Sequence, residues 1–248
     1  KTPVRLIPTY GFSLAAGGKK TSWLEFVIGA ERMYIVKDIP RLLSALANNE
    51  ELIYGKNFVL KPREMEFDAS AAALLAMLRQ AYAEEQQRTA WNYYASSASA
   101  FADPRRFRLT DPNLLRFLEA MKDQPFAASI NHQTISEVKI RAGRPPLKLA
   151  VAAIDGGLQL VMDLAGDVLY GLDSDCQYLY HKTIIYKADA VFARYIKPLL
   201  KCFQENRKPE VFIPTAAVSD FVAVVLPALE TIAAVEVDDA VYAKFYRQ

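Results

Sequence analysis

The stretch WLEFVIGAERMYIVKDI, residues Trp23–Ile39, combines a strand pattern with the start of a helix, the two kinds of element expected along this chain. Apolar residues alternate with other residues on both sides of Gly29. Because alternation with a period of two is typical of strands with one buried face, we expect a β-hairpin here. Asp38 then provides an N-cap for a helix that has Pro40 in its first turn. The stretch contains no obvious catalytic group, so it indicates a scaffold.

Similar patterns predict helices and strands along the remaining sequence. Helices are expected where a capping residue precedes apolar residues at helical spacing, at 38–48, 69–87, 110–121, 189–203 and 215–232. Strands are expected at 4–14, 52–54, 57–60, 210–214, 233–239 and 241–246, with an antiparallel meander between 127 and 187. The first strand contains Pro8 and Gly11 and is expected at the edge of a sheet. The fold class is therefore α+β, with antiparallel hairpins and packed helices.

Two segments repeat one arrangement of elements. Tyr54–Asp68 and Tyr180–Asp189 each run from a strand through a charged stretch to an aspartate that begins a helix. This repeated order of elements indicates two similar α+β halves, 1–105 and 106–248. Residues 88–104 are expected to form the connection between them. The chain begins without Met and closes on alternating residues, so we expect a region of a longer polypeptide.

Composition restricts the class of protein without naming an activity. Apolar residues make up 52% and charged residues 23% of the 248, which is typical of a globular chain. The formal net charge of +2 means that any attraction to nucleic acid must be local. The two cysteines, Cys176 and Cys202, lie too far apart for a C-x-x-C motif, and His132 and His181 are the only histidines, which argues against a structural zinc site with four Cys or His ligands. No apolar run approaches the ~20 residues of a membrane span. The low cysteine content favours a cytoplasmic location.

One motif resembles a nucleotide-binding loop but departs from it. In GGKKT, Gly17–Thr21, Ser13 stands where the phosphate-binding loop needs its first glycine, and Lys20 replaces the hydroxyl residue that binds magnesium. An alternating strand pattern follows instead of an amphipathic helix. We therefore interpret the motif as a hairpin turn.

Two further groups of residues could support catalysis. Cys176 and His181 could form a thiol and base pair, and carboxylates between strands could bind a metal or transfer protons, namely Asp163, Asp167, Asp173 and Asp175. Aspartate is also a standard turn residue, and all four lie at predicted turns. We expect structural roles, with no catalytic residue and no metal site.

Three basic clusters give the clearest functional signal. Lysine and arginine release counterions when they neutralise phosphates, so converging clusters would give salt-sensitive DNA affinity. The candidate nucleic-acid-binding residues are Arg105, Arg106, Arg108, Lys139, Arg141, Arg144, Lys148, Arg194, Lys197 and Lys201. The alternative is that they form ordinary solvated faces, which the nearly balanced charge favours.

Several stretches together carry a family resemblance. The first is WLEFVIGAERMYIVKDIPRLLSALANNEELIYGKNFVL, and the later ones are IIYKA, VFIP and FVAVVLPALETIAAVEVDD. Their order of strands, a short helix and a Tyr-Gly-Lys strand is similar to the bacterial helicase-associated domain of SWI/SNF-type DNA translocases. The resemblance spans Val4–Phe245 and rests on distributed apolar and turn positions.

The resemblance implies a non-catalytic accessory domain that precedes an ATPase core and regulates the motor or contacts DNA or a partner. It implies no cofactor in this chain, ATP and magnesium in the parent core, that core as partner, and double-stranded DNA as a further candidate partner. No membrane is expected, and the oligomeric state stays open. Two alternatives remain: a dedicated nucleic-acid-binding module, and a small-molecule enzyme with a pocket around Asp167, Asp173 and His181.

Overall fold

The computed structural model describes residues 1–15, 18–91, 99–164, 167–206 and 208–245. The chain divides into two compact units, Lys1–Leu14 with Lys20–Ile140, and Ala15–Lys19 with Arg141–Gln248. The boundary differs from the expected division near residue 105, because strands that follow that position pair with the first strands of the chain. Helices pack on sheets in both units, so the α+β class is confirmed.

The first unit is built on a long antiparallel hairpin. Strand β1 (Thr2–Leu14) pairs with β2 (Lys20–Gly29) from Arg5 to Leu14. The sheet order is β9-β8-β1-β2-β3, with β6 beside β1 and β7 beside β2. The other strands of this unit are β3 (Tyr34–Ile35), β4 (Leu52–Gly55), β5 (Phe58–Leu60), β6 (Met65–Phe67), β7 (Phe107–Leu109), β8 (Phe126–Ile130) and β9 (Gln133–Ala142).

Strand β1 lies inside this sheet, whereas its proline and glycine predicted an edge. On one side it pairs with β2; on the other it pairs with β6 through residues 2–4 and with β8 through residues 9–12. Pro8 falls in the gap between β6 and β8. Neither β6 nor β8 pairs with Pro8, so its missing N–H removes no hydrogen bond to these two strands, and a proline can occupy a central strand there.

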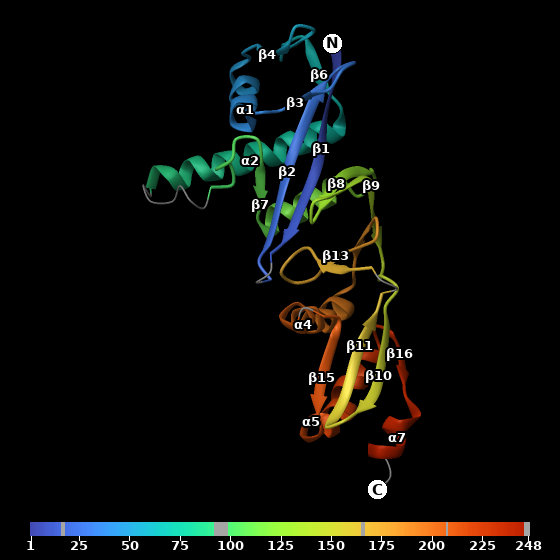
Figure 1. The fold of residues 1–248 in the computed structure, drawn as a ribbon. Coiled ribbons are helices and arrows are strands. Elements are labelled where there is room, and N and C mark those ends of the chain that lie inside the picture. The colour runs from blue at the N-terminus through green and yellow to red at the C-terminus, as the bar shows by residue number, and fades with distance from the viewer. Residues whose placement is uncertain (16–17, 92–98, 165–166, 207, 246–248) are drawn as a thin grey trace. The chain divides into compact units, whose positions relative to one another are not determined.

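Helices α1 (Ile39–Asn48), α2 (Ala69–Trp91) and α3 (Asp111–Ala120) belong to the first unit. Figure 1 shows α2 crossing behind the β1–β2 hairpin. Residues 92–98 of the expected connection lie outside the described residues. The core includes Tyr10, whose ring stacks on Phe117 with centroids 5.9 Å apart. Its hydroxyl is satisfied by Ser22 Oγ at 3.1 Å, so one polar pair is built into an otherwise apolar core.

The opening stretch folds as expected. Strands β2 and β3 form an antiparallel pair, and Asp38 Oδ1 accepts a hydrogen bond from Arg41 N at 2.8 Å to cap α1. Asp68 caps α2 in the same way through Ala71 N at 2.7 Å. Gly29 is required at the hairpin end because a Cβ there would collide with the carbonyl oxygen of Arg32.

The second unit contains a four-stranded sheet of order β15-β11-β10-β16. Its strands are β10 (Lys148–Ile154), β11 (Gly157–Asp163), β15 (Glu210–Pro214) and β16 (Ala234–Val237). The continuous meander expected up to residue 187 is therefore divided, because β15 occupies the free edge of β11. The strands that follow β11 pair with one another as an antiparallel meander outside the four-stranded sheet, β12 (Leu169–Gly171), β13 (Tyr178–His181) and β14 (Ile184–Lys187).

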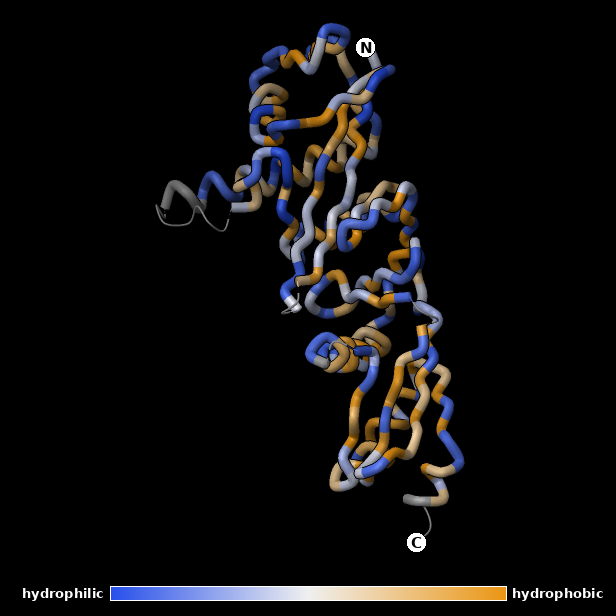
Figure 2. The backbone as a smooth tube through the Cα atoms, in the orientation of Figure 1, coloured by the Kyte–Doolittle hydropathy of each residue, from blue (hydrophilic) through white to orange (hydrophobic). Residues whose placement is uncertain are grey.

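The helical elements of the second unit are α4 (Ala190–Asn206), α5 (Thr215–Asp220), the π-helical turn η2 (Phe221–Val225), α6 (Leu226–Glu230) and α7 (Asp239–Phe245). Apolar side chains of α4 and α6 join those of β10 and β11 in one buried cluster. Figure 2 shows hydrophobic residues along β10, β11 and β15. Among the described residues, every helix is too short or too polar to span a bilayer.

The strand expected at 241–246 is wrong for residues 241–245, because they lie in helix α7, and residue 246 lies outside the described residues. Asp238 Oδ1 accepts from Ala240 N at 3.0 Å, and the Asp238 carbonyl accepts from Val241 N at 2.9 Å. Val241 is fully buried whereas Ala243 is exposed. A strand would have buried both residues on one face, so the period-two pattern was too short to decide the structure.

Candidate nucleic-acid interface

A groove on the first unit brings two predicted arginines together with a tryptophan. Arg106 and Arg108 flank the buried Phe107 at the start of β7, so both point away from the core. The register places Trp23 of β2 directly between Gly11 of β1 and Arg108 of β7. The groove therefore lies on the sheet face opposite the buried aromatic residues.

Gly11 makes room for the tryptophan. A Cβ at this position would collide with the indole ring of Trp23, so the ring lies over the bare backbone of β1. Glycine in a strand often marks such a close approach. The indole is half-buried and forms one wall of the groove.

Glu25 holds two of the arginines in place. Arg106 Nε donates to Glu25 Oε1 at 2.7 Å, and Arg105 Nη2 lies 3.6 Å from Glu25 Oε2. The Arg106 guanidinium carbon also lies 4.9 Å from the centre of the Trp23 ring, within cation–π distance. These contacts use the Nε and one face of the Arg106 guanidinium, and they leave its Nη groups as donors.

The groove has a volume of about 250 Å³. Its shape depends on a folded loop before β7, in which Asp103 Oδ1 accepts from Arg105 N at 3.0 Å and Arg108 N donates to the Ala100 carbonyl at 2.8 Å. The residues that line it are Thr21, Trp23, Ser99, Ala100, Ala102, Asp103, Arg106 and Arg108. Three arginines and the two carboxylates of Glu25 and Asp103 give the site a local charge of +1.

Arg144 of the second predicted cluster has a structural position. Its Nε donates to Asp189 Oδ2 at 2.6 Å, its Nη1 donates to the Thr231 carbonyl at 2.7 Å, and its guanidinium lies 5.6 Å from the Phe192 ring centre. The hydrogen bond from Arg144, with that from Phe192 N, lowers the pKa of Asp189 to about 2. The Arg144 guanidinium is therefore engaged in hydrogen bonds and packing inside the second unit.

The remaining members of this cluster are exposed. Lys139 pairs with Glu137 at 2.7 Å. Arg141, at the end of β9, and Lys148, at the start of β10, form no ion pair among the described residues. In this cluster Arg144 is therefore held by hydrogen bonds within its unit, whereas Lys139, Arg141 and Lys148 are exposed.

The third cluster lies along one face of α4. Arg194, Lys197 and Lys201 are spaced by three and four residues, as that face requires. Lys197 Nζ donates to Asp175 at 2.9 Å, which raises the pKa of the lysine, and Lys201 lies 4.0 Å from Glu205. Arg194 lies 5.8 Å from the Tyr195 ring centre. Exposed pairs of this kind contribute little to stability, so the lysines could exchange partners.

The residues tested for catalysis have structural roles in this fold. The buried Asp173 carboxylate accepts backbone hydrogen bonds from Asp175, Gln177 and Tyr178 at 2.8–3.1 Å and so fixes the β12–β13 connection. Asp167 pairs with Lys182 at 3.3 Å. His181 is buried, with Nδ1 at 3.2 Å from the Val168 carbonyl. The described residues contain no group of three or more side chains suited to a metal.

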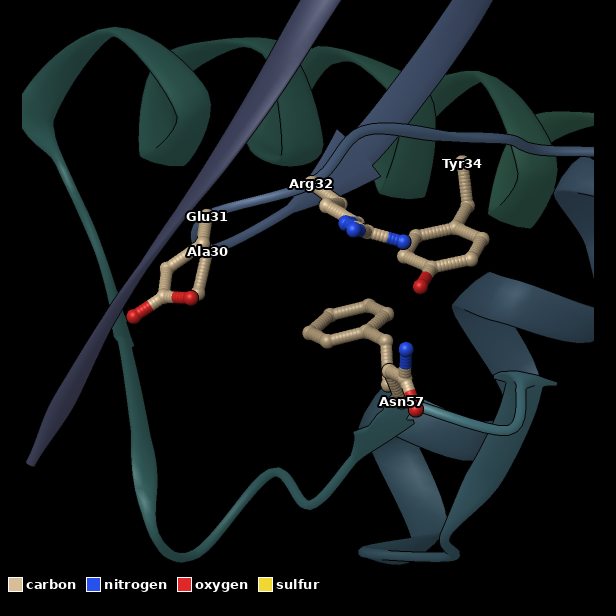
Figure 3. Close-up of a pocket in the computed structure, with 6 residues that line it drawn as sticks. Ala30, Glu31, Arg32, Tyr34 and Asn57 are labelled. Atoms are coloured by element: carbon tan, nitrogen blue, oxygen red, sulfur yellow. The ribbon is translucent and has the colours of Figure 1, made fainter.

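A second cavity of about 380 Å³ lies between the β2–β3 and β4–β5 connections of the first unit. Figure 3 shows Arg32 and Tyr34 extending toward Asn57, while the Glu31 side chain points away from them. The ring of Tyr34 stacks on Phe58 with centroids 5.5 Å apart. The ring of Tyr54 also lies near Phe58, with centroids 5.7 Å apart. Burial and then the charge of Asp38 raise the pKa of Tyr54 to about 12.

Sequence reasoning missed Trp23, Glu25 and Gly11 as parts of the arginine groove. The available signal was alternation, which placed Trp23 and Glu25 on the face opposite Leu24. An aromatic residue on the more exposed face of a strand is a candidate contact residue. Its arginine partners lie more than eighty residues away in sequence, so the pattern could not reveal the pairing.

Comparison with family models gives a match over residues 105–248, to a family described as bacterial SNF2 helicase associated. The match covers more than half of the chain and includes Arg105, Arg106 and Arg108, but not Trp23 or Glu25. Comparisons with curated proteins and with solved structures gave no match.

Proposed function

Because the chain belongs to the bacterial SNF2 helicase-associated family, we propose that it is an accessory domain of an SNF2-type DNA translocase. In this role it contacts the ATPase core of the translocase and modulates its action on DNA. ATP and magnesium are bound by that core, and the chain supplies no residue to the hydrolysis step. The family match is the observation that carries the proposal.

The β1–β2 hairpin supports the non-catalytic part of this proposal. A phosphate-binding loop holds phosphates at the N-terminus of a helix, where backbone N–H groups converge. Here the register from Leu14 paired with Lys20 continues without interruption into β2. Lys20 and Thr21 therefore lie in a strand, where they lack the convergent N–H groups that such a loop needs.

Stabilisation by nucleotide tests the proposal. We expect the unfolding midpoint of the purified chain to be unchanged by saturating magnesium and ATP. A ligand at one hundred times its Kd would stabilise the fold by about 2.7 kcal/mol, which would raise the midpoint by roughly 5–10 °C. A shift of that size would overturn the proposal, because it would place a nucleotide site in this chain. The same titration with magnesium alone is the control for ion effects.

A further inference from the structure

We propose that the groove formed by Trp23, Arg106 and Arg108 binds the phosphodiester backbone of a nucleic acid. The inference rests on the proposed function, because a translocase accessory domain works beside DNA. Of the ten basic residues that the sequence offers as nucleic-acid contacts, the proposal selects Arg106 and Arg108, which lie in one groove. It also adds Trp23 and Glu25, which position the arginine donors.

Arg106 has the geometry of a prepared phosphate donor. A guanidinium group presents several N–H donors in a plane, which suits the oxygens of a phosphate. Glu25 fixes the Nε side of this plane, and the Trp23 ring supports one of its faces. The side chain therefore loses less conformational entropy when its Nη groups bind an anion.

Arg108 supplies a second donor at a defined separation. It lies in β7, two residues after Arg106, which directly precedes that strand; extended backbone puts the two on the same face, about 7 Å apart. Arg108 forms no ion pair among the described residues, and Thr21 adds a hydroxyl at the groove wall. Two guanidinium groups in a row along a strand favour a chain of phosphates over a single isolated anion.

The size and charge of the groove set the expected affinity. At about 250 Å³ it falls below the roughly 300–1,000 Å³ of a pocket that encloses a whole small molecule, so it suits a phosphate and part of its sugar. A local charge of +1 and two phosphate contacts predict weak, salt-sensitive binding. The slope of log affinity against log salt should be about −1.8 for a duplex and about −1.4 for a single strand.

The test uses fluorescence anisotropy with the complete chain and a labelled DNA of arbitrary sequence, as a duplex and as a single strand, at several salt concentrations. The variants Arg106→Gln and Arg108→Gln should each weaken binding and reduce the slope by about 0.9 for the duplex. Arg63→Gln is the matched control, because Arg63 is an exposed arginine of the same unit outside the groove. The strand form that binds more tightly identifies the natural source of the phosphates.

Two results would overturn the inference. One is the absence of binding to both DNA forms at low salt, and the other is an equal loss of affinity in the control and the groove variants. All variants should keep the unfolding midpoint of the wild type, since the substituted side chains are exposed. Neither result would alter the nucleotide titration, so failure here is distinguishable from failure of the proposed function.

The variant Glu25→Ala distinguishes a site with preorganised arginines from non-specific electrostatic attraction of DNA to a basic surface. The substitution removes a negative charge, so a diffuse basic surface would bind DNA more tightly. In the proposed groove, Arg105 and Arg106 lose their anchor and DNA binding weakens. A higher affinity in this variant would contradict the positioning role of Glu25. A lower affinity with an unchanged unfolding midpoint would support it.

Discussion

Two glycines of the β1–β2 hairpin face different kinds of neighbour. The atom closest to a Cβ at Gly29 would be the carbonyl oxygen of Arg32, whereas at Gly11 it would be a ring atom of Trp23. A backbone carbonyl is held by the turn around it and moves only with that turn. A half-exposed indole can rotate away, so equal added volume should have unequal cost at the two positions.

Gly29→Ala should therefore destabilise the first unit by about 1–3 kcal/mol, the usual cost of overpacking. Gly11→Ala should cost less, but it should displace Trp23 and shift the tryptophan emission. Calorimetry gives the unfolding midpoint of both variants, and fluorescence reports the indole. Equal loss of stability at the two positions would show that the surroundings of Gly29 are more adaptable than the structure indicates.

At the level of elements, the start of α4 joins three segments of the second unit. Asp189 Oδ1 accepts from Phe192 N at 2.9 Å, and Oδ2 accepts from Arg144 Nε at 2.6 Å. Arg144 continues to the carbonyl of Thr231, just after α6. One aspartate thus caps a helix and orients the arginine that bonds to another helical segment.

Asp189→Asn should lower the unfolding midpoint at neutral pH and flatten the acid end of the stability curve. The folded pKa of about 2 lies below the ordinary 3.8, so the ionised carboxylate contributes stability above about pH 4. That contribution is lost as the pH falls from about 4 toward 2. Thermal unfolding across this range checks the expectation, with the exposed Asp123→Asn as control for charge loss. Parallel pH profiles for wild type and Asp189→Asn would contradict it.

Local signals predicted the helix starts well, whereas pairings between distant strands could not be predicted. Asp38 and Asp68 cap helices through residues three positions on, so neighbouring residues contain the whole interaction. The division of the expected meander depends on β15, which lies far along the chain and takes the edge of β11. The groove likewise requires β7 to pair with β2. At Val241, three alternating residues fitted either a strand or a helix, and the cap at Asp238 decided for the helix.

At the scale of the whole molecule, the chain combines a scaffold in which Lys20 and Thr21 lie in a strand with a groove that we propose binds phosphates. The family match over residues 105–248 relates it to SNF2 helicases, and the arginine groove draws its donors from the start of that region. Trp23 and Glu25 come from β2, which lies outside the matched region. The division of labour that we propose is an ATPase core that hydrolyses ATP and an accessory domain that contacts the core and the DNA.

Phosphate release from ATP in the presence of duplex DNA tests this division most directly. The chain alone, the ATPase core of its SNF2-type translocase alone, and the two together are compared under one condition. We expect no release by the chain alone and a changed DNA-stimulated rate for the core when the chain is present. Hydrolysis by the chain alone, or a rate for the mixture equal to that of the core, would contradict the account.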